Sequence, residues 1–225
     1  MKLAAALVLS LLVAACGLVP KQQDGDILVI GDSVMAWNRS DQADVGHIIA
    51  KVTHRRVVSR AALGAQVRVG PLGSLVGLNI PDQLSSGRWN WVVMNGGAND
   101  LGFSCGCTQC DGEIDALISP DGTGGDIPRL IENARAGGAK VLWMGYYQAP
   151  HSTSFKGCRP GLVEIERRIA TYAGARDSVF FVDAEDFFDP GDQNLLGPDN
   201  THPSAAGSAV IGRTLAQTIT RNSTR

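Results

Sequence analysis

The chain has 225 residues, of which 44% are hydrophobic and 19% are charged, and its formal net charge at pH 7 is -2. This composition is typical of a globular protein, and one domain of this length buries a substantial core. The chain carries no basic excess, so we expect no nucleic-acid partner. Beyond the N-terminal segment, no apolar run is long enough to predict a membrane-spanning helix.

The first residues form a distinct segment. Lys2 is followed by an almost uninterrupted apolar run over residues 3–15 and then by Cys16. A positive start, an apolar centre and small residues at the end predict a secretory signal peptide. The sequence Val-Ala-Ala-Cys at residues 13–16 resembles the bacterial lipobox, which implies cleavage before Cys16 and lipidation of its thiol. The alternative is a plain signal peptide followed by an incidental cysteine.

A lipid on Cys16 would anchor the protein to a membrane without spanning it. We therefore expect an exported lipoprotein of the bacterial cell envelope, facing the periplasm or the exterior. The expected organisation is a signal peptide over residues 1–15, a tether over residues 16–25 and a single domain over residues 26–225.

Short apolar runs alternate with amphipathic stretches through the rest of the chain. The apolar runs predict five β-strands, at residues 27–30, 56–59, 91–94, 141–144 and 179–182. Apolar residues at helical spacing predict helices at residues 43–52, around residues 127–134, around residues 162–173 and from Pro203 onward. This alternation favours a parallel sheet covered on both faces. The predicted fold is a three-layer α/β/α sandwich with a flavodoxin-like five-stranded parallel sheet.

Four cysteines lie in the predicted domain: Cys105, Cys107, Cys110 and Cys158. An even number in an exported chain favours two disulfides. Cys105 and Cys107 are too close in sequence to pair comfortably, so we expect Cys158 to bond one of the three clustered cysteines. The alternative is a zinc site, because the cluster has a spacing that suits that metal.

Residues 101–125 contain the cysteine cluster and show no clear periodicity. Loops of this length are usually functional or cross-linked. We expect this region to be held by the disulfides and to form part of the rim of the functional site.

Polar motifs follow the predicted strands. Ser33 comes directly after the first strand, Gly64 after the second and Asn99 after the third, while Asp199 and His202 precede the last helix. Open α/β sheets bind ligands at the carboxyl ends of their strands, so these residues are well placed to form a site. Taken singly, each could be an ordinary turn or helix cap.

Together these motifs resemble the four sequence blocks of the SGNH (GDSL-like) hydrolases, over about residues 26–217. The good matches are Gly31-Asp32-Ser33, Gly97-x-Asn99-Asp100 and Asp199-x-x-His202. The second block is looser and keeps little besides Gly64. The first block also departs from many members at Val34, where they have leucine.

The resemblance implies that Ser33 is the nucleophile, that His202 is its general base and that Asp199 orients His202. It also implies an oxyanion hole made of the backbone N–H groups of Ser33 and Gly64 and the side-chain amide of Asn99. The chemistry agrees, because a serine hydroxyl needs a base and a histidine can both take and return a proton. A neutral amide donor suits a developing oxyanion.

Several other residues near the motifs have less specific expectations. The resemblance implies that Asp32 and Asp100 fix two loops and are not part of the triad. His151 follows the fourth strand and could touch substrate. Trp37 and Phe103 could line an acyl pocket, although plain packing is the expectation for both. Two further histidines are expected to be ordinary surface or packing residues, His47 and His54.

We therefore expect a serine esterase or acylhydrolase that works through an acyl-enzyme and needs no metal or other cofactor. Its substrate would be a small-molecule, lipid or carbohydrate ester. Two alternatives are an acyltransferase that uses the same site on envelope sugars or lipids, and a surface binding lipoprotein with no catalysis. The motifs leave open the acyl length, the alcohol part and the oligomeric state.

Overall fold

The computed structural model describes residues 26–223. The expected signal peptide, the tether and Cys16 lie outside this range. Five parallel strands form one sheet in the order β2-β1-β3-β4-β5. Their bounds are β1 Ile27–Ile30, β2 Val57–Ser59, β3 Trp91–Met94, β4 Lys140–Met144 and β5 Val179–Val182. This order confirms the predicted flavodoxin-like sheet.

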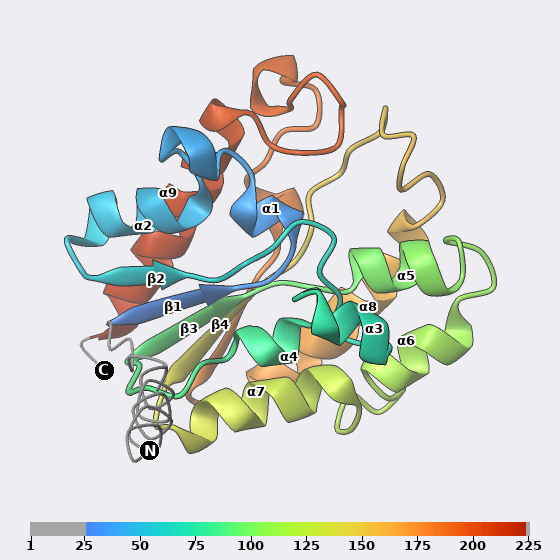
Figure 1. Ribbon diagram of the computed structural model, residues 1–225, viewed down its shortest axis with the longest axis horizontal. Coiled ribbons are helices and arrows are strands. Elements are labelled where there is room, and N and C mark those ends of the chain that lie inside the picture. Colours follow the sequence, from blue (N-terminus) through green and yellow to red (C-terminus); the bar gives the residue numbers. More distant parts are fainter. Residues whose placement is uncertain (1–25, 224–225) are drawn as a thin grey trace, which may run out of the picture.

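Helices cover both faces of the sheet (Figure 1). One face carries α2 (Val45–Thr53) and α9 (Ala205–Ser223), and the other carries α7 (Asp126–Ala136) and α8 (Arg159–Gly174). Shorter helices connect these layers: α1 Ser33–Ala36, α3 Pro71–Leu75, α4 Ile80–Gln83, α5 Ala98–Ser104 and α6 Asp111–Leu117. Single 3₁₀ turns occur at η1 Arg39–Asp41, η2 Ala184–Asp186 and η3 Gln193–Leu195. Within residues 26–223, no helix is long and apolar enough to cross a membrane.

The strands are apolar throughout because both of their faces are buried. In β1, Ile27 and Val29 pack in the cluster that includes α2 and α9, whereas Leu28 and Ile30 pack in the cluster on the α7 and α8 side. Successive side chains of a strand point to opposite faces, so one continuous apolar run supplies both cores.

The two helices on the first face approach each other closely at Gly212. A Cβ atom added there would lie 2.5 Å from the Cβ of Ile48. Such a separation is too short for two carbon atoms, so glycine is needed for α9 to dock at this distance from α2.

Two predicted helix starts are shifted in the structure. Helix α2 begins at Val45 because Asp44 is its N-cap and accepts the backbone N–H of His47 at 2.8 Å. Helix α9 begins at Ala205 and not at Pro203, because Pro203 pairs with Leu196 in an antiparallel β-bridge.

Residues 101–125 are not the irregular loop that the sequence predicts. They contain most of α5 and all of α6, and two disulfides staple them, Cys105–Cys110 and Cys107–Cys158. The expectation that Cys158 bonds one of the clustered cysteines is confirmed. All four thiols are used in disulfides, so they do not form the alternative zinc site.

Candidate active site

Ser33 is the first residue of α1 and directly follows the turn that ends β1. Asp32 is the N-cap of this short helix, and its carboxylate accepts the backbone N–H of Val34 at 2.9 Å. Gly31 has a φ of +139°, and a Cβ atom there would come within 2.0 Å of Asn95 Oδ1. The glycine therefore permits the turn that places Ser33 at the carboxyl edge of the sheet.

His202 and Asp199 lie beside Ser33, in the loop before α9. His202 Nε2 lies 2.8 Å from Ser33 Oγ, and His202 Nδ1 lies 2.5 Å from Asp199 Oδ2. Asp199 Oδ1 accepts the backbone N–H groups of Thr201 and His202, each at 3.0 Å. The side chains of Ser33, His202 and Asp199 are thus connected by two successive hydrogen bonds.

Asp199 is held in its ionised form. Burial works to raise its pKa, but the hydrogen bonds from the side chain and backbone of His202 and from Thr201 outweigh this effect. The pKa of Asp199 therefore lies below its ordinary value. An ionised carboxylate at Nδ1 favours the tautomer of His202 that leaves Nε2 free to accept the proton of Ser33.

Trp37 covers one face of the His202 ring. The two ring centroids lie 3.8 Å apart, and the ring planes differ by 6°. Trp37 directly follows α1, and its N–H bonds the carbonyl of Ser33 at 2.8 Å, so its position is fixed by the helix that carries Ser33. The expectation of plain packing misses this contact, because Trp37 packs against a residue of the site.

Asp32 is buried in a network that fixes the loop of Ser33. Its carboxylate accepts hydrogen bonds from Asn95 Nδ2 at 2.8 Å and from the phenol of Tyr146. Burial raises the pKa of Asp32, and these hydrogen bonds oppose that rise. The pKa of Tyr146 is raised well above 10 by burial and by Asp32, so the phenol keeps its proton and donates it.

Sequence reasoning missed both Asn95 and Tyr146. The available signal was their position, because each is a polar residue within two places of the end of a buried strand, β3 or β4. This is the edge where the site forms.

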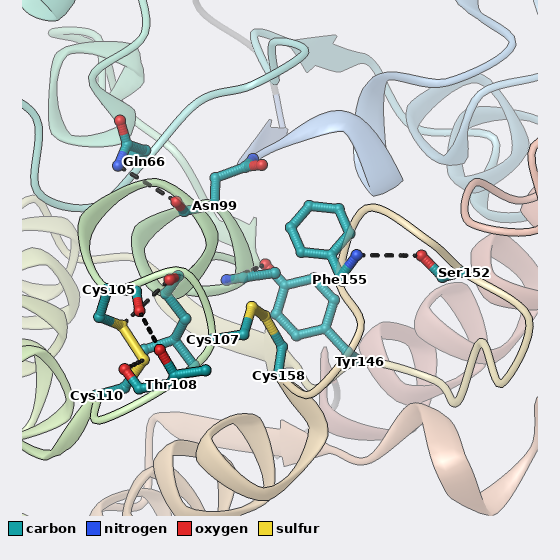
Figure 2. The surroundings of a disulfide bond; sticks show 12 residues. Gln66, Asn99, Cys105, Cys107, Thr108, Cys110, Tyr146, Ser152, Phe155 and Cys158 are labelled. Atoms are coloured by element: carbon teal, nitrogen blue, oxygen red, sulfur yellow. Dashed lines mark hydrogen bonds between the residues drawn. A yellow bond between two sulfur atoms is a disulfide. The ribbon is translucent and has the colours of Figure 1, made fainter.

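Gly64 and Asn99 lie next to each other. Gly64 has a φ of +74°, and a Cβ atom there would meet only Leu78 Cδ2, at 4.0 Å. Backbone conformation and not crowding is therefore what favours glycine at this position. Asn99 is buried in the first turn of α5, and its Nδ2 donates to the carbonyl of Ala65 at 2.9 Å. Figure 2 shows Asn99 with its neighbour Gln66 on the adjoining loop.

Asp100 fixes this pair of loops. Its carboxylate accepts the backbone N–H groups of Val67 at 3.1 Å and of Arg68 at 2.7 Å. Burial raises the pKa of Asp100 to about 6. These contacts agree with the structural role that the resemblance implies for Asp100.

A cavity of about 250 Å³ opens beside Ser33 and His202. Its walls come mainly from the segment after β4 and from the first turns of α8, and they include Tyr146, Ala149, Phe155, Leu162, Val163 and Glu166. Residues 101–125 do not line it, contrary to the expectation. They instead hold the wall in place, because Cys107–Cys158 ties them to the residue before α8, and Figure 2 shows Tyr146 and Phe155 around this disulfide.

The wall of the cavity is also tied to the loop of His202. Tyr147 donates its phenol hydrogen to the carbonyl of Thr201 at 2.7 Å. Ser152 Oγ lies 2.7 Å from Thr201 Oγ1. The wall and the loop of His202 therefore support each other.

The remaining candidate residues lie away from the site. His151 does not line the cavity, although Pro150 and Ser152 beside it do. The Phe103 side chain is 69% exposed and is neither packed nor in the cavity. His54 lies on the surface at the end of α2, and His47 bonds Asp44 on the same helix, as expected for surface residues. Over residues 26–223, no group of three or more His, Cys, Asp or Glu side chains could hold a metal ion.

Residues 29–210 match the model of the GDSL-like lipase/acylhydrolase family. The chain belongs to this family. It is therefore a GDSL-like hydrolase, and the resemblance based on the four blocks is confirmed at the level of the family. No curated protein sequence matches the chain.

Solved structures share the fold of this GDSL-like hydrolase at low sequence identity. A protein assigned to the SGNH hydrolases from Slackia heliotrinireducens is 20% identical over 88% of this chain and all of its own, with a TM-score of 0.60. A GDSL-like lipase from Bacteroides thetaiotaomicron is 19% identical over 87% of each chain, with a TM-score of 0.59. A family two carbohydrate esterase from Clostridium thermocellum is 20% identical over 90% of this chain and 65% of its own, with a TM-score of 0.56.

Proposed function

We propose that this GDSL-like hydrolase is a serine esterase that cleaves a carboxylic ester through an acyl-enzyme. The observation that carries the proposal is the row of contacts from Ser33 Oγ through the His202 ring to Asp199. A nucleophile, a base and an orienting carboxylate within hydrogen-bond reach are what ester cleavage by a serine requires.

In the first half of the reaction, Ser33 Oγ attacks the ester carbon while His202 Nε2 takes its proton. Collapse of the tetrahedral intermediate breaks the bond to the alcohol, and His202 returns the proton to the departing oxygen. In the second half, His202 takes a proton from a water molecule whose oxygen attacks the acyl carbon. The bond from this carbon to Ser33 Oγ then breaks, the acid departs, and His202 returns the proton to Ser33. Asp199 stays ionised throughout and stabilises the imidazolium of His202.

The oxyanion would be stabilised by the backbone N–H groups of Ser33 and Gly64 and by the amide of Asn99. Two observations support this assignment. Ser33 starts a helix, so its N–H has no partner within the helix. Asn99 Nδ2 uses one hydrogen on the carbonyl of Ala65, beside Gly64, which leaves the other to donate.

A fluorophosphonate probe followed by mass spectrometry tests the assignment of Ser33. We expect a single label on Ser33 in the wild-type protein and none in Ser33→Ala. Asp199→Ala should label much more slowly, because His202 loses its orienting carboxylate. Equal labelling of wild type and Ser33→Ala, or no labelling of the wild type, would contradict the esterase and favour a binding protein.

We further propose that the hydrolase is an envelope lipoprotein, anchored by lipid on Cys16. The support is the lipobox-like sequence at residues 13–16, which lies outside the described residues. Expression in a bacterium should yield a membrane-bound protein with diacylglyceryl-modified Cys16. Cys16→Ser should be recovered unlipidated, and an unmodified wild-type Cys16 would overturn this proposal.

A further inference from the structure

One face of α8 lines the cavity beside Ser33. Arg159, Leu162, Val163 and Glu166 lie at i, i+3, i+4 and i+7, which places them on the same side of the helix. Leu162 and Val163 make this part of the cavity apolar. Glu166 adds a carboxyl group that the proposed ester cleavage does not use.

Glu166 is buried and only half satisfied. Its residue is 6% exposed, and its Oε1 accepts the backbone N–H of Tyr146 at 2.6 Å. Within residues 26–223, no hydrogen bond reaches Oε2, and this oxygen is not among the fully buried atoms that lack a partner. Because Glu166 lines the cavity, its second oxygen is available to a donor or acceptor that enters there.

Arg159, the cation on the same face of α8, does not neutralise Glu166. Arg159 binds Glu185 instead, with Nε at 3.0 Å and Nη2 at 2.7 Å from its two oxygens. Gln148 Nε2 also donates to Glu185, at 3.0 Å. Burial raises the pKa of Glu166 to about 8, and the carboxylates of Asp183 and Glu185 add to the rise. Glu166 is therefore mostly protonated at pH 7, with an O–H that can donate.

We assign this cavity to the alcohol part of the ester. It is lined by Ser33, Thr201 and His202, whereas two of the three expected oxyanion donors, Gly64 and Asn99, do not line it. Because His202 returns the proton to the departing alcohol, the alcohol part of the ester occupies the space next to this ring.

Tyr146 connects Glu166 to the loop that carries Ser33. The backbone N–H of Tyr146 bonds Glu166, and its phenol bonds Asp32, which precedes Ser33. Ser33 and Glu166 also line the same cavity, so an alcohol that extends from Ser33 along this wall approaches the carboxyl group of Glu166.

We propose that Glu166 is a specificity-determining residue that bonds a free hydroxyl group on the alcohol part of the ester, so the pocket prefers small polyhydroxylated alcohols to alkyl alcohols. This inference rests on the proposed esterase function. A hydroxyl group gives the carboxyl group both a donor and an acceptor, whereas an alkyl group leaves it unpaired. A site that is built to bond a hydroxyl discriminates against an analogue that lacks it.

Two acetate esters that differ only in hydroxyl groups test the proposal, glycerol monoacetate and propyl acetate. Hydrolysis is followed at pH 7 by titrating the released acid, and kcat/KM is measured for each ester. We expect the wild type to prefer glycerol monoacetate by about 2- to 10-fold, the range that one net hydrogen bond supplies. The same measurement is made with a monoacetylated glucose. Its preference over propyl acetate is compared with that of glycerol monoacetate, and the larger preference shows whether the pocket favours a ring alcohol or an open-chain alcohol.

Three variants separate recognition from a merely structural role. Glu166→Leu should reduce the preference to near 1, while Glu166→Gln should keep most of it, because an amide both donates and accepts. If Glu166 only supports the wall through Tyr146, both esters should slow by the same factor in Glu166→Leu and the preference should persist. Glu164→Leu is the matched control on the same helix, since Glu164 pairs with Arg167 and Arg168 and does not line the cavity.

The possible failures are distinguishable. If neither ester is cleaved in a Ser33-dependent way, the proposed function fails, and this inference fails with it. If both are cleaved but the wild type shows no preference, or Glu166→Leu retains it, only the role of Glu166 is overturned. Should Glu166→Leu not fold, Glu166→Met, which has a similar length but cannot donate a hydrogen bond and accepts one only weakly, gives the same decision.

Discussion

The phenol of Tyr146 donates its hydrogen to the buried carboxylate of Asp32, the residue immediately before Ser33. The same phenol oxygen accepts the backbone N–H of Ala98 at 3.2 Å, at the start of the helix that carries Asn99. One hydroxyl group therefore joins the turn of the nucleophile to the helix of the expected oxyanion donor. The two loops are held in register by a residue that takes no part in the chemistry.

Removing this hydroxyl should reduce both activity and stability. In Tyr146→Phe, Asp32 loses a donor and Ala98 loses an acceptor in a buried place, at a cost of about 1–3 kcal/mol in unfolding free energy. We expect kcat to fall by about 10-fold or more as Ser33 and Asn99 lose their relative position. Urea unfolding and ester hydrolysis measure the two effects.

Tyr172→Phe is the control for Tyr146→Phe. Tyr172 of α8 donates to Glu132 of α7 and does not line the cavity. This variant should keep the wild-type kcat. Equal losses of kcat in the two variants would show that Tyr146 acts only through general stability.

Because Trp37 stacks on His202, the activity should depend on how much of the aromatic ring is kept at position 37. Trp37→Ala should lower kcat/KM by about 3- to 10-fold, corresponding to the 0.5–1.5 kcal/mol that aromatic pairs contribute beyond area burial. The variant frees the imidazole to tilt away from Ser33 Oγ. Trp37→Phe should recover most of the activity because a smaller ring can still stack. A fully active Trp37→Ala would show that the contacts with Ser33 and Asp199 alone hold the imidazole.

The two disulfides should differ in their contribution to stability. Cys107–Cys158 spans 51 residues of sequence, whereas Cys105–Cys110 spans 5. Cross-linking a longer loop removes more entropy from the unfolded chain. Replacing Cys107 and Cys158 by serine should cost about 4 kcal/mol, and replacing Cys105 and Cys110 about 2 kcal/mol. Thermal or urea unfolding of the two double variants checks the order, and the reverse order would refute the loop-length account.

The same double variants should differ in ester hydrolysis. Loss of Cys107–Cys158 frees the residues before α8, which include Phe155 and Gly157 in the cavity wall. We expect KM to rise in this variant. The Cys105–Cys110 variant should keep the wild-type KM, because neither of its cysteines adjoins the wall.

Glu166 predicts an unusual dependence of stability on pH. Its pKa is about 8 in the folded protein and close to the ordinary 4.5 when unfolded. Below pH 4.5 both states hold the proton. As the pH rises from 4.5 to 8, only the unfolded state releases it, so the unfolding free energy falls. Relative to Glu166→Gln, the wild type should lose on the order of 4 kcal/mol between pH 4.5 and 9.

Glu164 should give the unfolding free energy a pH dependence of the opposite sign, which Glu164→Gln tests. Hydrogen bonds from Arg167 and Arg168 lower the pKa of Glu164 to about 2. Its contribution to stability is therefore present above pH 4.5 and is lost as the pH falls toward 2. In urea unfolding from pH 2 to 9, the wild type should lose its advantage over Glu164→Gln below pH 4.5 and should lose stability relative to Glu166→Gln above pH 4.5. A parallel response would contradict the account of Glu166.

The sequence predicts the sheet well because its strands are buried on both faces. Runs such as residues 91–94 are therefore apolar at every position, and this pattern locates the strands. Their alternation with helices favours a parallel sheet, whereas the order of the strands is seen in the structure. Helices α5 and α6 escape prediction because they are short and begin at glycine and cysteine caps with no side-chain hydrogen bond. Their positions are supported by disulfides and by packing on α8, which no local pattern contains.

The residues of the site also fall into two groups, those that the sequence identifies and those that only the structure reveals. Ser33, Asn99 and His202 stand in short motifs at the ends of elements, so the resemblance to the family's sequence blocks identifies them as candidates. Tyr146 and Glu166 depend on which strands are neighbours and on how α8 is rotated. These relationships arise only when segments distant in sequence pack together, so they become visible only in the structure.

The proposed base, His202, lies 169 residues after the proposed nucleophile, Ser33, in the loop immediately before α9. Helix α9 packs on α2, where Gly212 approaches Ile48 closely. The contact between Ser33 and His202 therefore joins residues near the two ends of the described chain. A truncation before His202 would remove the proposed base and leave the proposed nucleophile in place.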